Sequence, residues 1–115
     1  MILVDQDDVL RGLKRCKRLA KQAILASGRT ADPSFWTTQA EARRTTYDDL
    51  MARIQREGIE PTYQAARSRY EQLTASLTPH ETGERQALEM FFTILGLNVT
   101  PPAAPEQGAP QLVTS

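Results

Sequence analysis

Apolar residues near the start of the chain recur with the spacing of one helix face. Six positions follow one another at intervals of 4, 3, 4, 3 and 4 residues: Val9, Leu13, Cys16, Ala20, Ala23 and Ser27. Residues three and four apart lie on the same side of a helix. The pattern therefore predicts a first helix, with Asp5 as its N-terminal cap and Gly28 as its C-terminal stop.

A second segment repeats this period. Asp32 followed by Pro33 is a typical helix entry, and Gly58 is placed to end the helix. Between them the stripe has the same five intervals and consists of Trp36, Ala40, Arg43, Tyr47, Leu50 and Ile54. A second helix is predicted here.

Two more helices are predicted downstream. Only "GIEP" precedes the next periodic segment, so a helix opening at Pro61 should form an antiparallel hairpin with the second helix. Its narrow apolar seam comprises Tyr63, Ala66, Tyr70, Leu73 and Leu77. Thr78 and Glu81 then form a capping-box pattern for a fourth helix up to Gly96. That helix is the most apolar segment and should occupy the centre of the core; its apolar residues are Ala87, Leu88, Met90, Phe91, Phe92, Ile94 and Leu95.

The helical periods and short connectors define the fold class. The chain has 115 residues, a length suited to one domain. We predict an all-α, single-domain, up-and-down bundle of about four helices over residues 1–97. Residues 98–115 contain four prolines and no periodic apolar pattern, which predicts a disordered Pro-rich tail.

Composition excludes several general roles. The chain carries 14 basic and 14 acidic side chains, so zero net charge gives no overall attraction to nucleic acid or membranes. One cysteine permits no intrachain disulfide and favours a reducing compartment. No signal-peptide pattern or membrane-spanning apolar run is found. We therefore expect a cytoplasmic protein with no membrane contact.

Positive charge is nevertheless concentrated in the first helix. The segment from Val9 to Leu25 has six basic residues and no acid. At 100° per residue, five of them point away from the apolar stripe: Arg11, Lys14, Arg15, Arg18 and Lys21. This basic face has three interpretations, which are a solvated surface, a site for an acidic protein partner, and a site for nucleic acid or another polyanion.

Arg43 interrupts the stripe of the second helix, where the period calls for an apolar residue. An unpaired buried guanidinium would be costly, so we expect one of three arrangements for the Arg43 side chain. One is an ion pair with Glu84, which falls in the apolar arc of the fourth helix. Another is a side chain that runs along Tyr47 to solvent. The third is an interface with another subunit or partner.

The sequence offers few side chains suited to catalysis or metal binding. His80 is the single histidine, and with Glu84 it supplies two ligands where a transition-metal site needs three or four. Cys16 lies on the apolar stripe and is interpreted as a small buried residue. We therefore predict no catalytic residue, metal or cofactor. The preferred interpretation is a small helical interaction protein, as a homo-oligomer, adaptor or regulatory subunit; the alternative is polyanion binding through the basic face.

Overall fold

The computed structural model describes residues 4–74 and 77–97. This part of the chain forms four α-helices and no strand: α1 (Gln6–Ala26), α2 (Pro33–Glu57), α3 (Ile59–Gln72) and α4 (Pro79–Ile94). A single 3₁₀ turn, η1 (Ser27–Arg29), follows α1. The predicted all-α bundle of four helices is thus confirmed, whereas the predicted tail at 98–115 lies outside the described residues.

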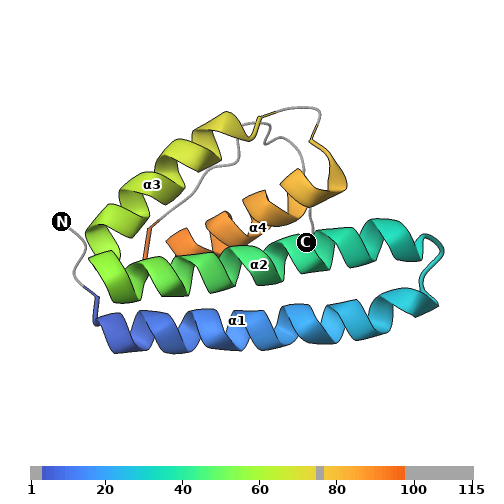
Figure 1. Ribbon diagram of the computed structural model, residues 1–115, viewed down its shortest axis with the longest axis horizontal. Coiled ribbons are helices and arrows are strands. Elements are labelled where there is room, and N and C mark those ends of the chain that lie inside the picture. Colours follow the sequence, from blue (N-terminus) through green and yellow to red (C-terminus); the bar gives the residue numbers. More distant parts are fainter. Residues whose placement is uncertain (1–3, 75–76, 98–115) are drawn as a thin grey trace, which may run out of the picture.

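The helices run alternately up and down (Figure 1). The two longest, α1 and α2, lie side by side, and α2 also packs along α4, so α2 is the central helix of the bundle. Helix α3 starts close to the end of α2 and then diverges from it. The contacts of α3 with α2 and α4 are accordingly fewer than those between α2 and its other neighbours.

Two of the predicted helix boundaries are formed by the expected caps. The Asp32 side chain accepts a hydrogen bond of 3.2 Å from the backbone N–H of Phe35 at the start of α2. At the start of α4, the Thr78 hydroxyl accepts from the Glu81 N–H at 3.1 Å, and the Glu81 carboxylate accepts from the Thr78 N–H at 3.0 Å. This capping box satisfies two backbone donors that the helix itself leaves unpaired.

Several details of the predicted boundaries are wrong. Helix α3 ends at Gln72, so Leu73 and Leu77 of its predicted seam lie beyond the helix. Asp5 is the residue before α1, but its side chain makes no capping hydrogen bond. Helix α1 ends at Ala26 and not at Gly28, because the backbone continues into the 3₁₀ turn. Helix α3 begins at Ile59, so Pro61 lies within its first turn, where the missing N–H of proline costs nothing.

Gly58 is the single link between α2 and α3, and its φ of 91° suits glycine.

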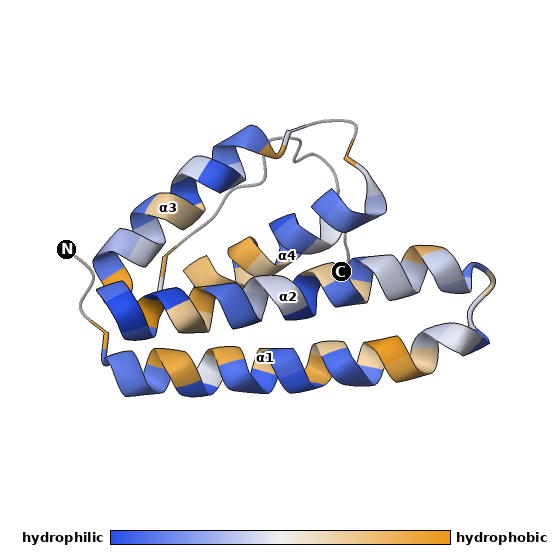
Figure 2. Ribbon diagram, viewed as in Figure 1, coloured by the Kyte–Doolittle hydropathy of each residue, from blue (hydrophilic) through white to orange (hydrophobic). Residues whose placement is uncertain are grey.

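The core forms where the four stripes meet, and α4 contributes several of its most buried residues. Phe91 and Ala87 have no exposed surface, and Leu13 of α1 is equally buried. The hydropathy colouring shows apolar residues concentrated in the second half of α4, while the visible side of α3 is mainly hydrophilic (Figure 2). Two apolar residues that were expected to be buried are partly exposed: Trp36 is 46% exposed and Met90 is 42% exposed.

Glycines allow α4 to approach its neighbours closely. A Cβ atom on Gly83 would lie 2.2 Å from the backbone oxygen of Gln39, a distance at which the two helices would have to separate. A Cβ on Gly12 of α1 would lie 3.3 Å from Cδ1 of Ile94. The position of α4 against α2 therefore depends on the absence of a side chain at residue 83.

Candidate functional site

All five basic residues assigned to the outer face of helix α1 are exposed. Arg11 forms an ion pair with Asp8 on the same helix. The other four have no acidic partner among the described residues, and we call them the basic row: Lys14, Arg15, Arg18 and Lys21. Their charges therefore face solvent without local compensation.

Basic residues elsewhere in the described chain are almost all paired. Helices α2 to α4 contain six arginines within 4.0 Å of a carboxylate: Arg44, Arg53, Arg56, Arg67, Arg69 and Arg85. On α1 itself, Lys17 reaches Asp48 of α2 at 2.6 Å. In a chain of zero net charge, uncompensated positive charge is thus concentrated on one side of α1.

The end of the α1–α2 hairpin extends past α4 (Figure 1), and several large apolar side chains of α1 and α2 are exposed. Leu25 is 83% exposed and Leu19 57%. At the start of α2, the rings of Phe35 and Trp36 form an edge-to-face pair with centroids 4.9 Å apart, and both remain partly exposed. Trp36 continues the predicted apolar stripe of α2, but it is not part of the buried core cluster.

The proposed Arg43–Glu84 ion pair is not formed. The Arg43 side chain is half-buried and donates a 3.1 Å hydrogen bond to Gln86 of α4. Glu84 instead accepts two hydrogen bonds from Arg69 of α3, at 2.6 and 2.9 Å. Arg43 of α2 thus contacts α4 through Gln86 and not through Glu84.

The Arg69–Glu84 pair belongs to a set of polar contacts that attach α3 to α4. The Tyr70 hydroxyl donates to Glu89 at 2.9 Å, and the guanidinium of Arg85 lies 5.5 Å from the centre of the Tyr70 ring. Two side chains on different helices carry no common sequence signal, so this contact could not be predicted.

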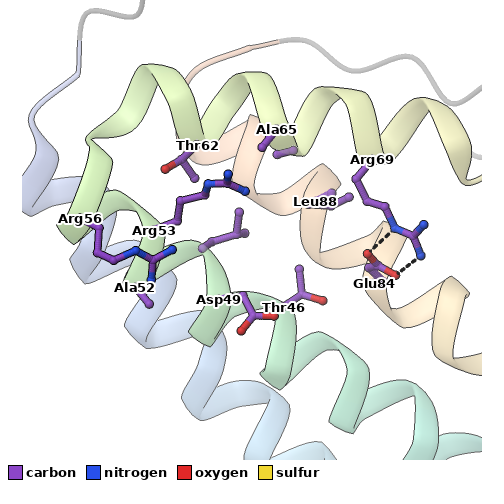
Figure 3. A pocket seen from close by; sticks show the side chains of 12 residues that line it. Thr46, Asp49, Ala52, Arg53, Arg56, Thr62, Ala65, Arg69, Glu84 and Leu88 are labelled. Carbon is purple, nitrogen blue, oxygen red and sulfur yellow. Dashed lines mark hydrogen bonds and ion pairs between the residues drawn. The ribbon is translucent and has the colours of Figure 1, made fainter.

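A cleft opens where α3 diverges from α2 (Figure 3). Its volume is about 360 Å³, and α4 contributes to its lining. We call it the interhelical cleft; its lining residues are Thr46, Asp49, Leu50, Ala52, Arg53, Arg56, Thr62, Ala65, Ala66, Arg69, Glu84 and Leu88. Of these residues, Glu84 was considered from the sequence as a partner of Arg43 and as a possible metal ligand, and none was assigned to a cleft.

Cys16 and Tyr47 form a polar contact between α1 and α2. Burial raises the pKa of the Cys16 thiol, although a hydrogen bond from Tyr47 opposes this effect. Burial also raises the pKa of Tyr47 to about 12, with a smaller contribution from the Cys16 sulfur. Both groups are therefore protonated near neutral pH, and this environment does not favour a thiolate nucleophile.

The remaining candidates offer no reactive cluster in the part of the chain that the structure describes. His80 is exposed in the first turn of α4. Within residues 4–74 and 77–97, no group of three histidine, cysteine or acidic side chains is gathered to hold a metal ion. Over the same ranges, no helix combines the length and apolar character needed to cross a bilayer.

Comparison with known proteins does not assign the chain to a family or a function. No protein-family model, curated protein or solved structure matches the chain. The surface of α1 and the interhelical cleft are therefore the two features from which a function can be inferred.

Proposed function

We propose that the protein acts by binding an acidic protein partner through the outer face of α1. The observation that carries this proposal is the unpaired basic row, set against arginines of α2 to α4 that contact carboxylates. Acidic side chains pair with most of the other basic residues of the described chain, whereas none forms an ion pair with the basic row. Leaving one face uncompensated favours association with an oppositely charged surface.

Exposed leucine favours a protein over a nucleic acid as the partner. Leu25 follows Lys21 by four residues and Arg18 by seven, so it continues the same line along α1. It is 83% exposed, more than any other large apolar residue among those the structure describes. A leucine offers apolar contact that a phosphate backbone does not use, whereas protein interfaces combine an apolar centre with charged surroundings.

Self-association through this face is disfavoured. A two-fold dimer brings the same surface patch of both copies together, so the two basic rows would face each other. Like charges held opposite one another oppose binding. The proposal is therefore an adaptor or regulatory subunit for a different protein, and the lone Cys16 favours the reducing cytoplasm as its location.

The decisive experiment compares two variants of equal charge in binding a short amphipathic peptide rich in Glu and Leu. The first variant replaces Lys14, Arg18 and Lys21 by Gln. We expect its affinity to fall by about tenfold or more, since several charge contacts are lost. Its thermal unfolding should match that of the unmodified protein, because exposed charges contribute little to stability.

The matched control replaces Arg43, Arg44 and Arg67 by Gln and should retain binding. Equal loss in both variants would show a general charge effect and contradict a site on α1. Leu25→Ser separates the partner classes: it should weaken peptide binding and leave retention on heparin or duplex DNA unchanged. If DNA binds and the peptide does not, polyanion binding replaces the proposal.

A further inference from the structure

We propose that the interhelical cleft binds a small amphipathic monocarboxylate, whose acid group contacts Arg53 and Arg56. This ligand site is separate from the outer face of α1 and does not rest on the function proposed above. The inference combines three features of the cleft, which are its size, its apolar floor and the uneven distribution of its charges.

The shape of the cleft follows from the divergence of α3. Gly58 turns the chain directly from α2 into α3, and small side chains at Ala52 and Ala65 leave the space between the helices unfilled. Its volume of about 360 Å³ falls within the range of small-molecule sites, which are often found between the helices of bundles. Leu50 and Leu88, both buried, supply an apolar floor for a hydrocarbon body.

Positive charge is available at one end of the cleft. Arg53 extends from α2 into the gap toward Thr62 of α3, and Arg56 lies beside it (Figure 3). The two guanidinium groups share a single carboxylate, Glu57, at 3.4 and 3.9 Å. These contacts are long and partly exposed, so they hold the arginines weakly. A ligand carboxylate can therefore form charge-assisted hydrogen bonds with them.

The other polar groups restrict the ligand to one negative charge. At the opposite end Arg69 is occupied, because two of its nitrogens donate to Glu84 and a third donates to Gln72 at 3.2 Å. Asp49, which also lines the cleft, has no ion-pair partner among the described residues. The carboxylates of Asp49 and Glu84 repel a second anionic group, so a monocarboxylate with an apolar chain fits better than a polyphosphate.

The test is a titration of the full chain with octanoate, followed by backbone amide shifts in NMR spectra. We expect saturable shifts confined to residues that line the cleft. Replacing both Arg53 and Arg56 by Gln should weaken binding by about tenfold or more, because the charge-assisted contacts are lost. Arg67→Gln, which removes a paired arginine from the outer side of α3, should leave the affinity unchanged.

Two further measurements separate a shaped site from unspecific adsorption. Ala65→Leu places an apolar side chain in the cleft and should abolish binding while the melting temperature is maintained or raised. Octylammonium, with the same chain length and opposite charge, should not produce the shifts. The proposal is overturned if octanoate causes no saturable shifts in the cleft, if Ala65→Leu binds normally, or if octylammonium binds equally well.

Discussion

At the residue scale, the contact between Gly83 and Gln39 sets how closely α4 approaches α2. The Gln39 backbone oxygen occupies the position that a side chain at residue 83 would need. A backbone atom cannot rotate away as the end of a flexible side chain can. Gly83 is therefore a packing requirement, although nothing in its local sequence distinguishes it from a helix-weakening glycine.

Gly83→Ala should destabilise the protein by about 3 kcal/mol, because the inserted methyl group forces two packed helices apart. Gly28→Ala is the matched control. A Cβ there meets no atom within 4 Å, so the change should be neutral or slightly stabilising. Chemical denaturation of the two variants measures the difference, and equal stabilities would contradict the close approach.

A second residue-scale prediction concerns the partner of Glu84. In double-mutant cycles, Arg69→Gln and Glu84→Gln should show a coupling free energy of about 1 kcal/mol, modest because Arg69 is partly exposed. Arg43→Gln and Glu84→Gln should show a coupling near zero, since Arg43 contacts Gln86 instead. A larger coupling for Arg43 would contradict the observed pairing.

At the scale of single elements, the two helix starts with capping sequences behave differently. The Thr78–Glu81 box is formed at α4, whereas Asp5 makes no side-chain cap at α1. In α1 the acid one turn further on, Asp8, pairs with Arg11 instead of completing a capping pattern. A capping sequence thus predicts where a helix begins more reliably than it predicts that the side-chain capping hydrogen bond is formed.

Thr78→Ala should therefore lower the free energy of unfolding by about 1 kcal/mol, because the cap of α4 is lost. Asp5→Ala should cost only a few tenths of a kcal/mol, which is the residual interaction of its charge with the helix N-terminus. Thermal unfolding of both variants provides the comparison. A cost for Asp5→Ala as large as that for Thr78→Ala would show that the α1 cap forms in solution.

At the scale of the whole molecule, the buried tyrosine on the central helix links folding to alkaline pH. Burial raises the pKa of Tyr47 to about 12 and also raises that of Tyr70. A pKa raised in the folded state means that the unfolded chain loses its protons first. The stabilising contribution of these groups is complete below pH 10 and is lost as pH rises through the folded-state values.

We expect the free energy of unfolding to fall between pH 10 and pH 12, measured by denaturant titration at each pH. Tyr47→Phe should reduce this slope, with the remainder arising from Tyr70 and other alkaline titrations. The variant has no phenol to ionise at position 47. An unchanged slope in Tyr47→Phe would show that its hydroxyl is not protected from solvent.

The sequence by itself determined the elements of this protein. The periods of four and three residues, the Asp32–Pro33 entry, the Thr78–Glu81 box and the stop at Gly58 depend on neighbours within one or two turns, so local patterns were sufficient. The outer face of α1 was predictable for the same reason, because a solvent-facing side follows once the buried stripe is identified.

Only the tertiary structure decided which elements meet and what lies between them. The partner of Glu84, the crossing at Gly83 and the interhelical cleft each depend on the relative placement of two or three helices. The exposure of Trp36 likewise depends on how far α4 extends along α2, since its own helical period is that of a buried residue. Helical periodicity specifies which side of a helix is buried, but the distance and angle between helices are set by side-chain packing across the whole core.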